Sequence, residues 1–211
     1  MVMITINTRA LAACALVLTG VAAAYAEPAS TARERAAALA VVKAGFADAS
    51  PEWTARLKQD EAQAVCSQYR NDPPAKIRQN LEKAQLATLV YPASGKLTGD
   101  WREGEKIAQE GRGLQFSDAP GGPVGGNCYA CHQMAPKEIA FGTLGPSLYQ
   151  YGKLRGNSEA VVRYTYGKIY NSQAYAACSN MPRFGHQGIL SEQQIRDVVA
   201  FLLDPESPVN Q

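Results

Sequence analysis

The sequence has only one long apolar run and no run of like charges. The apolar run, residues 10–24, is about 15 residues long, whereas a helix that spans a bilayer needs roughly 20. No polybasic arm or acidic tail is present, so neither nucleic acid nor an anionic membrane is indicated as a partner. The glycine-rich stretch at residues 121–126 contains no GxGxxG or Walker pattern, which argues against a phosphate-binding loop.

The first 26 residues have the features of a cleaved secretory signal. Arg9 precedes the apolar run, and Ala24-Tyr25-Ala26 supplies a small-residue cleavage pattern before Glu27. We therefore expect an exported, soluble protein that begins at Glu27 and has no membrane span. Loss of Arg9 leaves 20 of the 21 basic residues against 19 acidic ones, a net charge of +1.

The sequence also lacks convincing β-strands, and helical patterns account for most of it. A tyrosine-rich run at residues 161–166 has a strand-like composition, but the preceding Asn157-Ser158-Glu159 favours the start of a helix. We predict a mainly α fold, with a helical N-terminal extension at residues 27–97 and a second domain at residues 98–211. Helices are expected at residues 31–46, 51–69, 75–90, 101–110, 159–170 and 191–203.

Two of these helices begin with a recognisable cap. Asp100 can accept a hydrogen bond from the first turn of its helix, and Glu103, three residues later, can reach back to it. Ser191 and Gln194 form the same capping-box pattern before an apolar stripe. The C-terminal helix is therefore the best specified element of the sequence.

The stretch Gly126–Gln133 reads GNCYACHQ, with two cysteines three residues apart and a histidine directly after them. A thioredoxin-like redox pair would need a βαβ context, which is absent. A zinc site needs four ligands, but His186, Cys66 and Cys178 all lie 46 residues or more from the motif. A disulfide within the motif stays open as an alternative.

Covalent attachment of haem fits this motif best. Two thiols one helical turn apart can add to the two vinyl groups of a haem, and the imidazole of the next residue can then bind the iron. Cys128, Cys131 and His132 supply these groups in that order. Since bacterial c-type haem is attached outside the cytoplasmic membrane, the predicted export agrees with one covalent haem c and a periplasmic location.

The second axial position of the iron has three candidate ligands. Met134 lies two residues after His132 and is tethered to the same side of the haem. Met181 lies 49 residues after His132, in a loop that Pro182 stiffens. We predict His132 and Met181 as the iron ligands. The alternatives are His186, which would give a haem of lower potential, and a packing role for Met181.

Pro146 lies between the two predicted ligands, in the stretch TLGPSL. Its carbonyl oxygen is a candidate acceptor for the ring N–H of His132 that faces away from the iron, which would fix the tautomer and the plane of the imidazole. An ordinary turn at Pro146 is the alternative.

Cys66 and Cys178 are the cysteines left over in the exported chain. Because paired cysteines are normally oxidised outside the cytoplasm, we expect these two to form a disulfide. Such a bond would clamp the N-terminal extension onto the loop that carries Met181.

Several stretches together resemble the SoxX subunits of the thiosulfate-oxidising SoxAX cytochromes. They are GNCYACHQ, TLGPSL, YNSQAY and the C-terminal stretch that begins MPRFGHQGILSEQQ. More broadly, the haem motif, the methionine in a proline loop and the apolar C-terminal helix resemble a class I cytochrome c fold over about residues 98–203. The helical extension departs from the shorter members of the SoxX family.

The resemblance implies a function as well as a fold. In that family the single-haem SoxX subunit pairs with a larger haem subunit, SoxA, whose haem is held to be the catalytic centre. The complex couples thiosulfate to a cysteine of a carrier protein, an L-cysteine S-thiosulfotransferase activity, and passes electrons to a soluble cytochrome c. The resemblance therefore implies that this chain transfers electrons and has no catalytic residue of its own.

Two other functions are alternatives, a free single-haem electron shuttle and a self-sufficient haem enzyme such as a peroxidase. Two axial ligands argue against the enzyme, because they leave no open position at the iron. The extra helices are less needed in an isolated shuttle. We expect electron partners to dock on a rim formed by Tyr129, Gln133, Lys137, Arg183 and Phe184.

Overall fold

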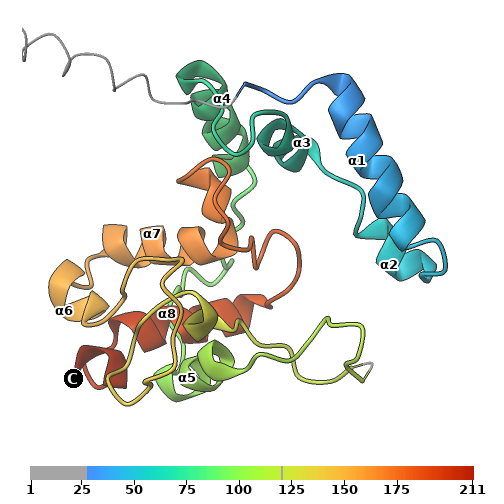
Figure 1. The fold of residues 1–211 in the computed structure, drawn as a ribbon. Coiled ribbons are helices and arrows are strands. Elements are labelled where there is room, and N and C mark those ends of the chain that lie inside the picture. Colours follow the sequence, from blue (N-terminus) through green and yellow to red (C-terminus); the bar gives the residue numbers. More distant parts are fainter. Residues whose placement is uncertain (1–27, 120) are drawn as a thin grey trace, which may run out of the picture.

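Helices and loops make up the part of the chain that the structure describes, and no β-strand occurs within it (Figure 1). The computed structural model describes residues 28–119 and 121–211, so the predicted signal segment lies outside it. The mainly α character predicted from the sequence is confirmed. The α-helices are α1 Ala32–Gly45, α2 Pro51–Ala55, α3 Glu61–Gln68, α4 Ala75–Leu86, α5 Trp101–Gln109, α6 Tyr151–Arg155, α7 Glu159–Tyr170 and α8 Glu192–Leu203.

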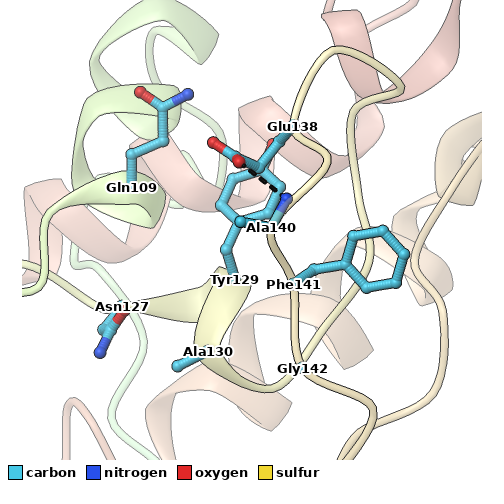
Figure 2. Close-up of a pocket in the computed structure, with 8 residues that line it drawn as sticks. All are labelled: Gln109, Asn127, Tyr129, Ala130, Glu138, Ala140, Phe141 and Gly142. Carbon is cyan, nitrogen blue, oxygen red and sulfur yellow. Dashed lines mark hydrogen bonds between the residues drawn. The ribbon is translucent and has the colours of Figure 1, made fainter.

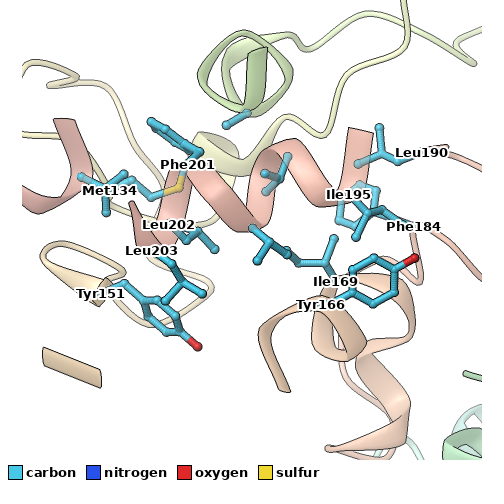
Figure 3. Close-up of a cluster of buried hydrophobic side chains, with 14 of the residues drawn as sticks. Met134, Tyr151, Tyr166, Ile169, Phe184, Leu190, Ile195, Phe201, Leu202 and Leu203 are labelled. Atoms are coloured by element: carbon cyan, nitrogen blue, oxygen red, sulfur yellow. The ribbon is translucent and has the colours of Figure 1, made fainter. Parts of the chain in front are cut away.

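The C-terminal helix α8 forms the centre of the larger hydrophobic core. Helix α5 packs across one side of α8, and α6 and α7 contact it as well (Figure 1). Ile195, Val198, Val199 and Leu202, the predicted apolar stripe, are each 5% exposed or less. Figure 3 shows α8 side chains among those of α6, α7 and the loops around them. The predicted capping box of Ser191 begins this helix.

Helices α5 and α8 cross at a glycine. A Cβ atom placed on Gly104 would lie 2.0 Å from the backbone oxygen of Asp197. The two helix backbones can therefore approach this closely only because residue 104 has no side chain. The Asp197 carboxylate is also buried, and Gln193 donates a hydrogen bond to it over 2.8 Å.

The start of α5 differs from the predicted capping box. Asp100 does cap the helix, accepting a hydrogen bond from the N–H of Arg102. Its own N–H donates to the Asp197 carboxylate over 2.8 Å, so that group already has a partner from α8. Glu103 instead forms an ion pair with Lys106. A contact with a distant helix has replaced the expected local one.

The N-terminal helices differ in their bounds from the prediction. The single helix expected at residues 51–69 is divided into α2 and α3, because Asp60 begins a new helix through a capping box with Gln63. Helix α4 ends at Leu86, not at residue 90. The short helix α6 was not predicted, since its five residues carry too little periodicity to recognise.

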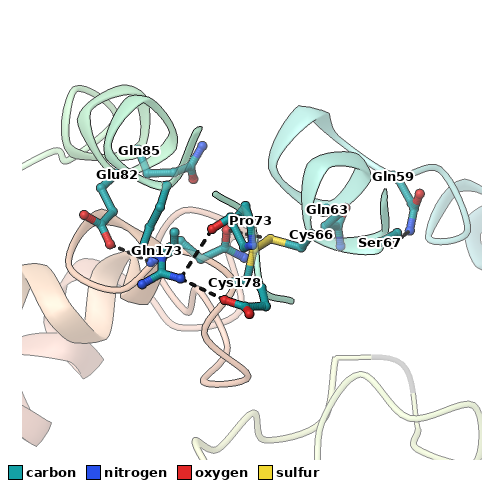
Figure 4. The surroundings of a disulfide bond; sticks show 12 residues. Gln59, Gln63, Cys66, Ser67, Pro73, Glu82, Gln85, Gln173 and Cys178 are labelled. Atoms are coloured by element: carbon teal, nitrogen blue, oxygen red, sulfur yellow. Dashed lines mark hydrogen bonds and ion pairs between the residues drawn. A yellow bond between two sulfur atoms is a disulfide. The ribbon is translucent and has the colours of Figure 1, made fainter. Parts of the chain in front are cut away.

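The N-terminal region has little core of its own. Helix α1 has no buried residue, and Figure 1 shows α1 and α2 at the outer edge of the molecule. A small cluster instead joins this region to the C-terminal one. Its buried members are Ala62, Cys66, Leu81 and Cys178. The predicted disulfide between Cys66 and Cys178 is present and lies within this cluster (Figure 4).

Membrane crossing needs a longer and more apolar helix than any found within residues 28–119 and 121–211.

Candidate haem-binding site

The two motif cysteines lie on a single tight turn. A 3₁₀ turn at Cys128–Ala130 follows Asn127, whose backbone is left-handed with a φ of 45°. The N–H groups of Cys131 and His132 both donate to the carbonyl oxygen of Cys128, over 3.1 and 2.9 Å. The turn therefore holds both sulfurs and the imidazole on one short piece of backbone. Neither motif cysteine is in a disulfide, so that alternative is not realised here.

Cys128 packs against the main hydrophobic core. Burial of its sulfur raises the pKa of the Cys128 thiol to about 12, so this thiol stays protonated at neutral pH. The described residues contain no group of three or more His, Cys, Asp or Glu side chains placed to hold a metal ion together.

The imidazole of His132 is oriented by the segment that follows it. Its Nδ1 atom lies 2.8 Å from the carbonyl oxygen of Pro146, which is the contact that the sequence suggested. With the proton on Nδ1, the Nε2 atom keeps a lone pair for a metal. The N–H of Gly145 donates to the carbonyl oxygen of Cys131 over 2.9 Å, which fastens the proline segment to the motif.

Gly145 is part of this arrangement, although the sequence did not single it out. A Cβ atom at this position would lie 2.2 Å from Cε1 of His132 and 2.5 Å from its Nδ1. A larger residue would therefore push the ring away from the carbonyl that orients it. The glycine of a Gly-Pro pair after a CxxCH motif was the available signal.

Large apolar side chains are exposed close to the motif in sequence. Ile139 is 89% exposed, Leu144 is 84% exposed and Phe141 is 37% exposed. Phe141 also lines a shallow pocket of about 340 Å³ beside the motif, together with Tyr129 and Asn127 (Figure 2). Exposed apolar groups of this kind are suited to contact an apolar cofactor or a partner protein.

Met181 lies in the loop that follows α7. Both of its backbone groups are held, since the hydroxyl of Ser172 donates to the Met181 carbonyl over 2.6 Å and the Met181 N–H donates to Ser179. Its side chain is partly buried and packs against the same core as Cys128. Met134 is 1% exposed and belongs to that core.

The second histidine, His186, is half-buried. Burial lowers the pKa of His186, and the nearby charge of Arg183 lowers it further. The N–H groups of Gly185 and His186 both donate to the carbonyl oxygen of Tyr170, which fixes this end of the loop.

The predicted docking rim is largely wrong. Tyr129, Arg183 and Phe184 are only 5% to 7% exposed. Lys137 is exposed and Gln133 is partly exposed. Arginine is rarely buried unless it is paired, and nothing in the sequence indicated that Asp60 pairs with Arg183. The exposed apolar residues Ile139 and Leu144 are better candidates for a contact surface.

The residues present fit the haem that the motif predicts. Two unpaired cysteines stand one turn apart, and an imidazole oriented through Nδ1 follows them. Glycine leaves room for that ring. A thioether is available from a loop on the same core, and thiols, imidazole and thioether are the donors that c-type haem uses.

The chain is similar to several known proteins. Residues 98–204 match the family model described as cytochrome c. A protein of Aquifex aeolicus (strain VF5) named "uncharacterized lipoprotein" is 42% identical over 156 residues, which cover 72% of this chain and 73% of that protein. A chain in the crystal structure of SoxXA from P. pantotrophus is 25% identical, with a TM-score of 0.38. The match covers 56% of this chain and 95% of that one.

Proposed function

Because this chain belongs to the cytochrome c family, we propose that it is the single-haem electron-transfer subunit of a SoxAX-type thiosulfate-oxidising complex. Membership of the family implies a covalently attached haem c and an electron-transfer role. The observation that carries the proposal furthest is the Cys128–His132 turn, with its imidazole oriented by Pro146. The assignment to the SoxAX kind rests on the SoxX-like stretches of the sequence.

Each residue of the site has a proposed role. Cys128 and Cys131 would hold the haem through thioether bonds, and His132 and Met181 would supply the protein ligands of its iron. The Pro146 carbonyl would keep a proton on Nδ1 of His132, which would leave Nε2 as a neutral ligand for the iron. When bound, the haem supplies reversible one-electron exchange. Methionine ligation raises the reduction potential of such a site.

Ligation by both His132 and Met181 would favour electron transfer over sulfur chemistry at this chain. With both residues as ligands, the iron would have no position left for a substrate. The chain therefore needs a partner that binds thiosulfate, which we propose to be a SoxA-type haem subunit. The pair would act as an L-cysteine S-thiosulfotransferase on a carrier protein and pass electrons to a soluble cytochrome c.

We also propose export to the periplasm, with cleavage after Ala26. A relative bears the name lipoprotein, and Cys14 is the one cysteine in the first 27 residues. Lipid attachment at Cys14 is the alternative that this name raises. Mass spectrometry of the exported chain distinguishes an N-terminus at Glu27 from a lipid-bearing Cys14.

Electron transfer and thiosulfate turnover can be tested separately on the purified haem protein. The chain, reduced by a small donor, is mixed with an oxidised cytochrome c. In a second assay the chain is offered thiosulfate and a carrier-protein thiol, with oxidised cytochrome c present as the electron acceptor. We expect rapid electron exchange and no turnover until a SoxA-type subunit is added. Turnover by the chain alone would indicate a self-sufficient enzyme, and exchange with no effect of the added subunit would indicate a free shuttle.

A further inference from the structure

Arg183 lies two residues after Met181 and is buried. Its positive charge is paired with a carboxylate of the N-terminal region. Its side chain is 5% exposed. Nη2 donates to the carboxylate of Asp60 over 2.6 Å, and Nη1 donates to the side-chain oxygen of Gln85 over 3.2 Å. These partners lie 123 and 98 residues away in the sequence. A buried charge is strongly destabilising without such partners, so Arg183 depends on them.

Asp60 is itself held in a fixed orientation. It is the N-cap of α3, and one of its carboxylate oxygens accepts the N–H of Gln63 over 2.9 Å. The side chain of Gln63 accepts the N–H of Asp60 in return, over 2.9 Å. The other carboxylate oxygen is therefore presented to Arg183 by the end of a helix, and it cannot turn away without loss of the cap.

Gln85 extends the same network to the residues before Met181. Its side-chain oxygen also accepts the side-chain N–H of Asn171 over 3.0 Å, and Asn171 is completely buried. The next residue is Ser172, whose hydroxyl donates to the carbonyl of Met181. Polar groups on α4 therefore reach the backbone of Met181 through two buried side chains.

The disulfide fastens the loop on the N-terminal side of Met181, whereas Arg183 lies on its C-terminal side. Cys178 lies three residues before Met181 and is bonded to Cys66 of α3. One residue earlier, the N–H of Ala177 donates to Glu82 of α4 over 3.0 Å. Figure 4 shows Glu82 and Gln85 on α4 next to the segment that contains Gln173 and Cys178. Met181 thus lies between two attachments to the N-terminal region, Cys178 and Arg183.

We propose that Asp60, Gln85 and Arg183 are positioning residues that hold the Met181 loop in the conformation in which its sulfur binds the iron. The N-terminal region would then tune the haem from a distance, by opposing dissociation of the sixth ligand. The inference rests on the proposed ligation by Met181. It assigns a role to the extension, which a cytochrome c domain of ordinary size lacks.

The test uses the full, haem-loaded chain and two properties of its sixth ligand. The oxidised protein should show the weak absorption band of methionine-to-iron(III) ligation, and its reduction potential reports the same bond. Asp60→Ser keeps a good N-cap residue but removes the partner of Arg183. Arg183→Gln removes the positive charge of the same ion pair. We expect both variants to lose the band at neutral pH and to shift to a lower potential.

Asp72→Ser is the matched control, because Asp72 forms an exposed ion pair with Arg78 in the same region. It should leave both the band and the potential unchanged. Arg183→Lys retains a buried cation and should recover part of the band. A merely structural role would lower thermal stability in the Asp60 and Arg183 variants without a change in the band or the potential.

The outcomes separate this inference from the proposed function. A wild-type protein without the band would contradict ligation by Met181 itself. A wild-type band that persists unchanged in Asp60→Ser would overturn the positioning role and leave the function intact. Where Asp60→Ser does not fold, Gln85→Leu is examined with imidazole as a competing ligand. We expect easier displacement of the methionine in this variant, and displacement equal to wild type would overturn the inference.

Discussion

Residues 98–211 bury a continuous apolar core, whereas residues 28–97 bury very little without help. The buried members of the main core lie between Ala108 and Val209. Helix α8 has eight buried residues and α1, which is two residues longer, has none. Hydrophobic burial can therefore stabilise the C-terminal region by itself.

The N-terminal region is attached by specific links instead. They are the disulfide between Cys66 and Cys178, the Arg183–Asp60 ion pair, and the side chains of α4 that contact the methionine loop. Such links are few and localised, so single substitutions should detach this region while the core stays folded. The comparison teaches that a region with little core can still hold a functional loop in place.

The largest expected effect comes from removal of the disulfide. The bond closes a loop across 112 residues, and its loss should cost about 4 to 5 kcal/mol on the chain-entropy model. Trp53 lies in α2 and Trp101 in α5, so one tryptophan reports on each region. In a Cys66→Ser, Cys178→Ser variant, denaturant should change the Trp53 signal well before the Trp101 signal.

Single Trp→Phe variants separate the two signals in this experiment. Coincident transitions in the variant without the disulfide, at the wild-type midpoint, would show that the bond does not hold the regions together.

A second comparison uses the same substitution in both regions. Gly104→Ala places a Cβ against the backbone of α8, and we expect a loss of about 3 kcal/mol, the upper end for overpacking, because neither backbone can move aside. Gly45→Ala, at the end of α1, meets no atom within 4 Å and should change stability by less than about 0.5 kcal/mol. Thermal unfolding of the haem protein measures both. Equal shifts would contradict the contrast between the regions.

Local signals made several of these features predictable. The haem motif, the capping box of Ser191 and the apolar stripe of α8 each depend on residues that are close together in the sequence. The structure has the cap and the stripe where they were expected. The disulfide was predictable by elimination, since the predicted export signal and the haem motif account for the other cysteines. The division between α2 and α3 was missed although Asp60 and Gln63 carry a capping pattern.

Contacts between distant residues were not predictable in this way. The N–H of Asp100 donates to Asp197 of another helix, and Glu103 forms an ion pair with Lys106 instead. Arg183 can be buried because it is paired with Asp60, which is 123 residues away in the sequence. No sequence pattern near either residue predicts that pair. Periodicity and caps describe one element at a time, whereas these side chains are placed by packing between elements.

Acid should loosen the attachment of the N-terminal region. Burial alone would raise the pKa of Asp60, but the hydrogen bonds from Gln63 and Arg183 outweigh it and hold this pKa below 3.8. The stabilisation from Asp60 is therefore present above pH 3.8 and is lost as the pH falls through the lower folded value. His186 acts in the same direction, because burial and Arg183 lower its pKa below 6.5, so stability already declines as the pH drops below 6.5.

The midpoint of the Trp53 transition, followed between neutral and acidic pH, measures this loosening. Asp60→Asn should start from a lower midpoint at neutral pH and should lack the decline below pH 4, whereas the exposed Asp72→Asn should follow the wild type. The effect should be smaller than that of the disulfide, because Asp60 is partly exposed and water screens its charge. A variant that declines in parallel with the wild type would show that another group is responsible.

The smallest effect is expected on the outer face of α1. Val41 is 74% exposed, so truncation to alanine removes almost no buried area and should change the free energy of unfolding by less than about 0.5 kcal/mol. Val199 in α8 is completely buried, and the same truncation there should cost on the order of 2 kcal/mol, since it removes two buried methyl groups and leaves a cavity. Thermal unfolding of the two variants compares the same chemical change in water and in the core. If Val41→Ala is as damaging as Val199→Ala, then α1 is covered in solution, and its apolar side chains at Leu39 and Val42 belong to an interface with a second chain.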